Sequence, residues 1–393
     1  MLPLTGLRML DLSRLLPGPY CSLIFADLGA DVVKVEEPQG GDYLRHLPPT
    51  VGENSAAFIA LNRNKRSIAL DLKSNDGRAA FLRLAKTADV VLESFRPGVL
   101  ARLGVDYAAL SAQQPGIILC SISGYGQDGP DALRAGHDIN YIARAGVLAC
   151  GGEPGGYPLI PGVQIGDVGG GSLLAAVAIL AALQERGRTG KGRHLDVSMC
   201  EGSLAFMAPH LGARLAAGAP RSPLLRGDDS LNGGYACYHV YATRDDRYVA
   251  LGALEPKFWE SFCAAIGRED FVELGYLTGD EGRAARKKVA AVFAERTREE
   301  WVAFSRNQDF CLEAVLEADE VFADPQHAAR GITFDLDDPH LGRKVAQLRV
   351  PLRFGEPPKR PAPLLGEHTD EVLAEAGFSG HEIAALRSCG AVA

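Results

Sequence analysis

The first 123 residues alternate short apolar runs with longer amphipathic stretches, and this alternation limits the possible folds more than any other feature. Residues 7–12 and 31–36 are predicted strands, and residues 19–28 between them are a predicted helix that opens on proline. Elements in this order are typical of parallel strands covered by helices, so we predict an α/β fold with a Rossmann-like parallel sheet. Further predicted elements are a helix at 76–87, a strand at 89–93, helical residues at 98–112 and a strand at 116–123.

The turn after the first predicted strand argues against dinucleotide binding, which is a common function of such a sheet. Its sequence, Leu-Leu-Pro-Gly-Pro at 15–19, lacks the G-x-G-x-x-G pattern that binds a dinucleotide. The glycine-rich segment 187–192 also lacks the spacing of a phosphate loop, and we interpret it as a basic turn before a strand at 194–199. A nicotinamide-dependent dehydrogenase is therefore disfavoured.

Composition and cysteine spacing argue against several kinds of partner. The chain has 393 residues and a net charge of -8, so bulk attraction to nucleic acid or to an anionic membrane is not expected. Its eight cysteines form neither C-x-x-C pairs nor zinc-ligand spacings, so we expect a reduced, cytoplasmic protein without a metal site. No secretory signal is evident, and the most apolar predicted helix, at 172–183, is too short to span a bilayer.

A change of pattern divides the chain into two domains. Residues 1–197 form the predicted large domain, and residues 198–230, which end in a stretch rich in proline and glycine, form a predicted linker. Aromatic and β-branched segments then flank Asp245-Asp246, which is a hairpin signal, and helices follow. We therefore predict a smaller α+β domain at 231–339.

An imidazole and a carboxylate lie between residues 134 and 172. His137 precedes an apolar run, and Asp167 belongs to a glycine turn, Gly-Asp-Val-Gly-Gly-Gly-Ser, just ahead of a predicted helix. The unpaired N–H groups and the positive dipole end of that helix favour negative charge, so an anionic intermediate can be held there. Taken alone, Asp167 is equally well explained as a helix cap, and His137 as a hydrogen-bonded core histidine.

Charged residues elsewhere offer further candidates. Basic residues gather at 62–66 and recur at Lys73, Arg96 and Arg102, where they can hold phosphates by charge-assisted hydrogen bonds. A solvated loop is the alternative explanation for each of them. Glu255 precedes a predicted helix that opens on proline, and an ordinary acidic helix start also explains it.

Several separated motifs occur in a recognisable order. They are Leu-Ser-Arg-Leu-Leu-Pro-Gly-Pro at 12–19, Asp-Leu-Gly-Ala-Asp-Val-Val-Lys-Val-Glu at 27–36, Asn-Lys-Arg-Ser-Ile-Ala-Leu-Asp-Leu-Lys at 64–73, Arg-Pro-Gly-Val at 96–99 and Gly-Tyr-Gly-Gln-Asp-Gly-Pro at 124–130. Together they resemble the class III CoA-transferase family (CaiB/BaiF type) over nearly the whole chain. Gly-His-Asp-Ile-Asn-Tyr at 136–141, the glycine turn at 166–172 and Leu-Glu-Pro-Lys-Phe at 254–258 resemble its α-methylacyl-CoA racemase branch.

The resemblance implies an acyl-CoA enzyme with a large Rossmann-like domain completed by residues 340–393, a smaller domain and an interlocked homodimer. No cofactor is expected beyond coenzyme A as part of the substrate. Where some racemases place an arginine against the adenine of coenzyme A, this chain has Glu37, and Arg45 is the candidate substitute. Coenzyme A contacts carried over by motif fall on Leu16, Lys65, Lys73, Arg102, Asp138 and Tyr141.

The racemase branch implies a two-base reaction on a 2-methylacyl-CoA. His137 and Asp167 remove and return the α-proton on opposite faces, while Glu255 hydrogen-bonds the histidine and backbone N–H groups from Asp167 onward receive the enolate oxygen. The alternative is CoA transfer between carboxylic acids, in which Asp167 attacks the thioester to form a mixed anhydride. His137 favours the racemase because transferases of the family generally lack it. A non-catalytic CoA-binding protein is a third hypothesis, disfavoured because all three residues are present.

Overall fold

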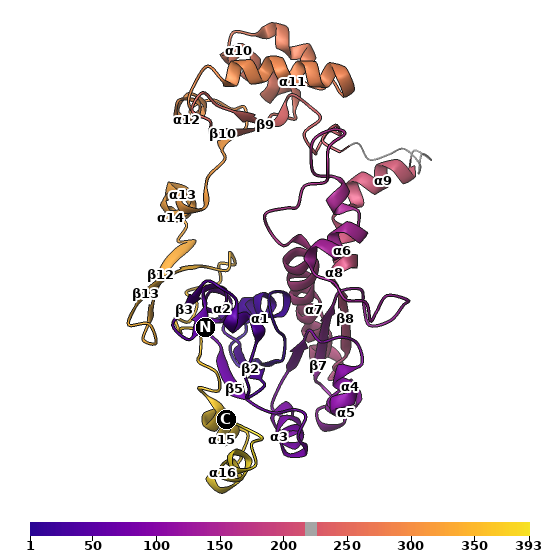
Figure 1. Ribbon diagram of the computed structural model, residues 1–393, viewed down its shortest axis with the longest axis vertical. Coiled ribbons are helices and arrows are strands. Elements are labelled where there is room, and N and C mark those ends of the chain that lie inside the picture. Colours follow the sequence, from indigo (N-terminus) through magenta and orange to yellow (C-terminus); the bar gives the residue numbers. More distant parts are fainter. Residues whose placement is uncertain (217–225) are drawn as a thin grey trace. The chain divides into compact units, whose positions relative to one another are not determined.

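The computed structural model describes residues 1–216 and 226–393, and the chain divides into two compact units (Figure 1). The first unit comprises Met1–Ala145, Val163–Phe206 and Gln326–Ala393, and the second comprises Gly146–Gly162 and Met207–Pro325. The predicted small domain ends at residue 339, whereas the second unit ends at residue 325. The part of the predicted linker that is rich in proline and glycine, at 218–223, lies outside the described residues.

The two units contain different kinds of sheet. The strands of the first unit are β1 (Arg8–Asp11), β2 (Asp31–Glu36), β3 (Thr50–Val51), β4 (Asn54–Ser55), β5 (Arg66–Ala69), β6 (Val90–Glu93), β7 (Ile118–Ser123), β8 (His194–Ser198), β12 (Thr333–Asp338) and β13 (Arg343–Leu348). Its helices are α1 (Pro17–Asp27), η1 (Tyr43–His46), α2 (Ala56–Asn62), α3 (Asn75–Ala85), α4 (Val99–Leu103), α5 (Tyr107–Gln113), α6 (Asp138–Arg144), η3 (Ile165–Leu173), α7 (Leu174–Thr189), α8 (Met199–Ala205), α15 (Thr369–Glu375) and α16 (Gly380–Ser388), and α14 (Pro325–Ala329) begins at the boundary. The second unit contains η2 (Val147–Ala149), α9 (Ala208–Ala216), β9 (Tyr238–Ala242), β10 (Tyr248–Gly252), α10 (Pro256–Ala265), η4 (Glu269–Leu274), α11 (Gly279–Phe293), α12 (Arg298–Ser305), β11 (Leu312–Ala314) and α13 (Ala318–Ala323).

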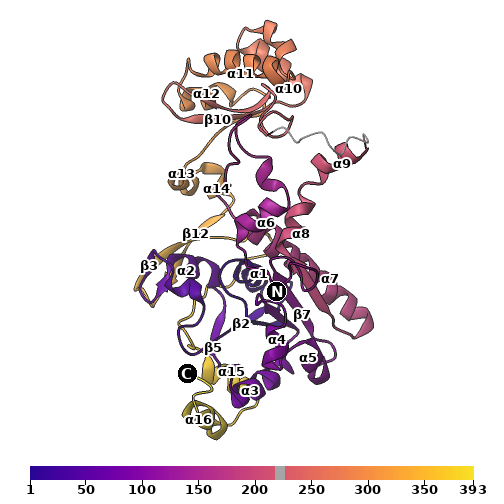
Figure 2. The ribbon, with the colours of Figure 1, turned by 45° about the vertical axis from the view of Figure 1, so that its right-hand side comes forward.

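Six parallel strands form the central sheet of the first unit, in the order β5-β2-β1-β6-β7-β8. Side chains of successive residues point to opposite faces, so Met9 enters the core beneath α1 and α7 while Leu10 enters the core beneath α3, α15 and α16 (Figures 1 and 2). The prediction of a Rossmann-like parallel sheet is confirmed. Two of the predicted strands, at 31–36 and 194–199, are β2 and β8.

The basic segment at 62–66 is buried and does not form an exposed loop. Arg63 Nη2 lies 2.5 Å from Asp27 Oδ2, and Arg66 pairs with Asp31 at 2.7 Å as it begins β5, a strand that the sequence did not predict. The prediction that this segment binds phosphates is wrong, because carboxylates of α1 and β2 already occupy these two arginines.

The most apolar helix is longer than the predicted 172–183. The π-helix η3 continues into α7, and the combined helix runs 25 residues from Ile165 to Thr189 with a mean hydropathy of 1.8 over its most apolar window. The prediction that this helix is too short to span a bilayer is therefore wrong, since its length and composition alone would allow a crossing. Ala175, Ile179 and Ala182 pack in the core of the first unit, and the core helix of a soluble protein can be equally long and apolar.

The second unit is a smaller α+β structure around aromatic side chains. Its antiparallel sheet has the order β11-β10-β9, and the predicted hairpin turns at Asp245-Asp246. Phe262 and Phe293 stack with ring centroids 5.5 Å apart, and the ring of Trp301 lies 4.7 Å from that of Phe293. These rings form a core separate from those of the first unit.

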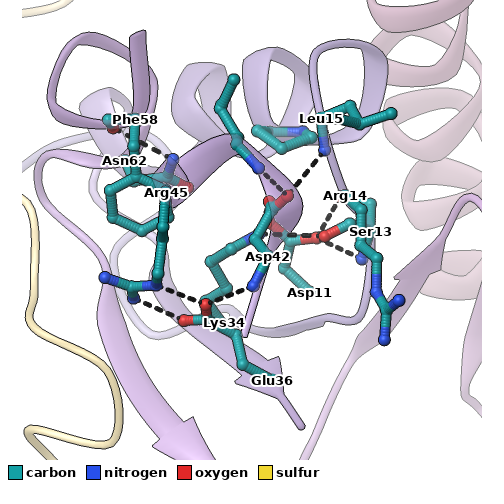
Figure 3. A network of polar contacts seen from close by, with 12 residues as sticks. Asp11, Ser13, Arg14, Leu15, Lys34, Glu36, Asp42, Arg45, Phe58 and Asn62 are labelled. Atoms are coloured by element: carbon teal, nitrogen blue, oxygen red, sulfur yellow. Dashed lines mark hydrogen bonds and ion pairs between the residues drawn. The ribbon is translucent and has the colours of Figure 1, made fainter. Parts of the chain in front are cut away.

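A cluster of buried charges holds the turn between β1 and α1 (Figure 3). Lys34 Nζ lies 2.9 Å from Asp42 Oδ2 and donates to Ser13 O at 2.9 Å, and both charged side chains are fully buried. Asp42 Oδ1 accepts the N–H of Leu15 at 3.0 Å, which holds this leucine in the left-handed region at φ 63°. Burial opposes the charge of Lys34, yet the carboxylates of Asp42 and Asp11 raise its pKa above the ordinary value.

Replacing Lys34 by methionine should destabilise the protein, because Asp42 would remain buried without its cation. We expect the free energy of unfolding, measured in urea, to fall by about 3–5 kcal/mol. Lys86→Met is the matched control, since Lys86 is exposed at the end of α3 and its loss should change that free energy by less than about 0.5 kcal/mol. Equal effects of the two substitutions would contradict the role given to Lys34.

Candidate active site

The first turn of α6 lies against the start of η3. His137 is the N-cap residue of α6, and its backbone N–H donates to Asn140 Oδ1 at 3.0 Å. Asp138 begins the helix, and its Oδ1 accepts the backbone N–H of Asp167 at 2.8 Å. Tyr141, one turn later, is buried and anchors α6 in the core. The fold thus places the segment that carries His137 and Asp138 against Asp167; the sequence predicts that His137 and Asp167 meet, but it gives Asp138 only as a contact of coenzyme A.

Asp167 lies in the first turn of a π-helix, whereas the sequence predicts a turn ahead of the helix. A π-helix holds its backbone less tightly than an α-helix and is frequent at functional sites. Gly170 of η3 makes room for α8: a Cβ there would lie 2.6 Å from Met199 O, and one at Gly202 would lie 2.2 Å from Gly170 O. The backbones of η3 and α8 can therefore approach closely only because these residues lack side chains.

Asp167 and Tyr141, two of the ionisable groups of this site, differ in the ease with which they exchange a proton. Burial and the carboxylate of Asp138 raise the pKa of Asp167 to about 6, while His137 acts in the opposite direction. The Tyr141 hydroxyl donates to Gly136 O at 2.5 Å, and burial and the charge of Asp167 raise its pKa to about 12. Tyr141 is therefore a neutral donor, whereas Asp167 can act as both acid and base near pH 6.

The backbone donors beside Asp167 are already engaged. Its own N–H bonds Asp138 Oδ1, and the N–H of Val168 bonds Gln164 O at 3.0 Å. The N–H of Asp167 therefore already has an acceptor in this structure, and its bond to an enolate oxygen stays a prediction. A carboxylate occupies that position, as is usual where N–H groups point out of the first turn of a helix.

Leu16, a predicted coenzyme A contact, is tied to the same segment. It is the N-cap residue of α1, at the carboxyl edge of the sheet, where open α/β folds bind their ligands. The hydroxyl of Ser172 donates to Pro17 O at 2.6 Å and lies 3.0 Å from Asp167 O. The start of α1 and the π-helix are thereby joined.

Lys73 and Arg102 are exposed, and a further arginine that the sequence analysis did not single out lies beside Lys73. Lys73 Nζ and Arg14 Nη2 each lie 3.6 Å from Glu37 Oε2, so the acidic residue that replaces an expected arginine sits between two cations. The guanidinium of Arg14 also lies 5.0 Å from the ring centre of Tyr43. The position of Arg14 in the turn after β1 is the feature of the sequence that could have identified this arginine.

Two predicted ligand contacts fail because their side chains are buried. Lys65 Nζ donates to Pro19 O and Asn62 Oδ1, both at 2.9 Å, and burial lowers its pKa to about 7. Arg45 is held by both carboxylate oxygens of Glu36, at 2.6 and 2.7 Å (Figure 3). Neither side chain is exposed to a ligand, so Lys65 as a coenzyme A contact and Arg45 as the substitute at the adenine are both wrong.

Glu255 belongs to the second unit. It is the exposed N-cap residue of α10, with Pro256 at the first helical position, which agrees with an acidic helix start. Its hydrogen bond to His137 of the first unit stays a prediction. Within residues 1–216 and 226–393, no group of three or more His, Cys, Asp and Glu side chains is arranged to hold a metal ion.

Known proteins resemble this chain over nearly its whole length. Residues 4–369 match the model of CoA-transferase family III. The chain is 37% identical to alpha-methylacyl-CoA racemase of Homo sapiens over 385 residues, which cover 98% of this chain and 96% of that protein. It is also 37% identical to succinate–glutarate CoA-transferase of Agrobacterium fabrum, with 95% of each chain covered. The crystal structure of a CaiB/BaiF family protein from Brucella suis matches with a TM-score of 0.82 at 33% identity, covering 95% of this chain and 99% of that one.

Replacing Gly170 by alanine should force η3 and α8 apart, because the new methyl group would lie 2.6 Å from Met199 O and 2.8 Å from Ser203 N. We expect the free energy of unfolding to fall by about 1–3 kcal/mol. Gly187→Ala in the adjoining α7 is the matched control: nothing lies within 4 Å of its added Cβ, so this substitution should be neutral or stabilise by up to about 1 kcal/mol. Urea unfolding distinguishes the two, and an unchanged stability of G170A would show that the close approach is not required.

Proposed function

The chain belongs to CoA-transferase family III, and we propose that it racemises 2-methylacyl-CoA thioesters by moving the α-proton. The juxtaposition of His137 and Asp167, joined through Asp138, carries this proposal. Racemisation needs two groups that transfer protons, whereas CoA transfer needs one nucleophile. A histidine beside Asp167 has a chemical role in the first reaction that the second does not require.

The proposed reaction proceeds through an enolate. One of the two residues takes the α-proton, and the electron pair of the broken C–H bond moves into the thioester carbonyl. The other residue then donates a proton to the opposite face of the α-carbon, which inverts the centre. The two residues finish in exchanged protonation states, so a carboxyl group with a pKa of about 6 suits both directions.

The enolate oxygen takes the Asp167 N–H in place of the Asp138 carboxylate. One anion replaces another at the helix start, so the N–H keeps an acceptor throughout. The residues of the chain and the acyl-CoA substrate supply every group that this reaction needs, without a metal or redox cofactor.

We further propose a cytoplasmic homodimer in which Glu255 hydrogen-bonds His137. A glutamate in that place would fix the tautomer of the imidazole and raise its basicity. Apolar side chains exposed along η3 and α7 support a second copy of the chain as their cover. These side chains are Leu173, Leu174, Val177 and Leu180.

CoA transfer between carboxylic acids is the second candidate. The chain is 37% identical to succinate–glutarate CoA-transferase, the same percentage as to the racemase, and the carboxylate of Asp167 is a candidate nucleophile toward a thioester carbonyl. In that reaction the carboxylate attacks the thioester carbonyl and displaces the CoA thiolate, which leaves a mixed anhydride. The second carboxylic acid then displaces the first from the aspartyl carbonyl, and the thiolate attacks the acyl carbonyl of the new anhydride, which forms the second acyl-CoA and frees Asp167.

Incubation with each enantiomer of a 2-methylacyl-CoA in D2O, without an acceptor acid, should place deuterium at the α-carbon with loss of configuration. Because each base faces one enantiomer, His137→Ala should lose exchange from one enantiomer and Asp167→Ala from the other, by about 10²–10⁴-fold. Mass spectrometry and chiral chromatography measure both quantities.

His381→Ala is the matched control, since His381 is exposed on α16, and it should exchange like the wild type. Absence of exchange in the wild type with several acyl groups, together with an acyl group on Asp167 that hydroxylamine releases, would establish the transferase instead.

Asp138→Asn should shift the pH profile of exchange to lower pH. The amide oxygen can still accept the Asp167 N–H, but the negative charge that helps raise the pKa of Asp167 is lost, so this pKa should fall below about 6. For the enantiomer on which Asp167 acts as base, kcat/KM should therefore persist to lower pH than in the wild type. Asp128→Asn, at an exposed carboxylate, should leave the profile unchanged, and an equal profile for D138N would contradict the coupling.

A further inference from the structure

We propose that Glu93 is a positioning residue for coenzyme A: a hydrogen-bonded path through Ser121 and His194 links its protonation to solvent, and its carboxylate holds the segment 94–102. This proposal rests on the proposed function, because the segment matters as the carrier of Arg102, a predicted contact of coenzyme A. The residues of the proton-transfer site do not include Glu93.

Glu93 ends β6 with a buried carboxylate. The residue is 3% exposed, and its Oε2 accepts the backbone N–H of Phe95 at 2.6 Å. This bond closes the turn that leads through Gly98, at φ 82°, into α4 and Arg102. An anionic acceptor makes such a bond shorter and about twice as strong as a neutral one.

The same turn is joined to the neighbouring loop at the ligand edge of the sheet. The N–H of Arg14 donates to Ser94 Oγ at 3.0 Å, and the guanidinium of Arg14 lies 5.5 Å from the ring centre of Phe95. Movement of the turn would therefore disturb both Arg102 and the loop that carries Leu16.

A path of hydrogen bonds leads from Glu93 to the surface. Ser121, on the adjacent strand β7, hydrogen-bonds Glu93, and its Oγ lies 2.9 Å from His194 Nε2 on the edge strand β8. His194 is exposed and stacks on Tyr107. A hydroxyl has one proton, so Ser121 donates to a Glu93 carboxylate while it accepts from His194. When Glu93 is protonated, Ser121 accepts from Glu93 and donates to His194.

The surroundings leave Glu93 poised to change its charge. A cleft of about 260 Å³ lies beside it, and no cationic side chain within residues 1–216 and 226–393 forms an ion pair with its carboxylate. Burial and the charge of Asp196 raise the pKa of Glu93 to about 7, although the bonds from Ser121 and Phe95 oppose this shift. The titratable and charged groups that face it across the cleft and along β7 and β8 are Arg96, Asp106, Tyr107, Cys120, His194 and Asp196.

The raised pKa of Glu93 determines the direction in which coenzyme A binding changes with pH. Above about pH 7 Glu93 is a carboxylate and grips the Phe95 N–H, whereas below that pH it is a neutral acid that holds the turn more weakly. Binding of coenzyme A should therefore weaken as the pH falls through 7.

Isothermal titration of coenzyme A into wild type and Glu93→Gln between pH 5.5 and 8.5 tests this inference. The amide is a neutral mimic of the protonated acid, so the wild type should bind about fivefold more tightly than the variant at pH 8.5, and both should bind alike at pH 5.5. Titration of the phosphates of coenzyme A affects both proteins equally and cancels in the ratio. Pantetheine, which lacks those phosphates, should show no such difference.

Ser121→Ala keeps the carboxylate and removes a bond that favours its charged form. The pH at which coenzyme A affinity changes should therefore rise in this variant, which separates the effect from simple misfolding of E93Q. If both wild type and E93Q bind coenzyme A and their affinities change in parallel with pH, this inference is overturned while the proposed function stands. Failure of the wild type to bind coenzyme A at any pH would overturn it together with the proposed function.

Discussion

The buried ion pair between Lys34 and Asp42 is the interaction on which the ligand edge of the first unit depends. Two charges without solvent are tolerated only when each has a partner, so the pair allows little freedom to the chain around it. Asp42 uses its second oxygen to hold Leu15 in a left-handed conformation, and Lys34 binds the carbonyl of Ser13. The turn that presents Arg14 and leads into α1 is therefore formed before any ligand arrives.

The candidate active site applies a related principle at the start of a helix. Asp138 accepts the N–H of Asp167 from a different helix. This single bond places His137, the neighbour of Asp138, near enough to influence the pKa of Asp167. Close packing through Gly170 keeps the π-helix against α8, so the position of Asp167 is set by backbone contact. Partial burial then brings its carboxyl group into the range where proton transfer is useful.

Local signals predicted the parts of this arrangement that depend on nearest neighbours. The run Asp-Val-Val-Lys-Val-Glu is rich in β-branched valine, and β2 occupies its six residues. Proline predicted the start of α10, and the histidine and aspartate motifs met as expected. Lys65 and Arg45 were misjudged because their partners, Asn62 and Glu36, reach them only after strands and helices pack together.

Periodicity, the missing dinucleotide motif and the family motifs followed directly from the order of residues, since they depend on chemistry at fixed separations along the chain. They were sufficient for the parallel sheet, the class of protein and the meeting of the segments that carry His137 and Asp167. Packing alone decided which cations remain exposed, that Asp138 occupies the N–H of Asp167, and that the glycine segment forms a π-helix against α8. Burial and hydrogen-bond competition among distant segments determine these features, and no local sequence pattern predicts them.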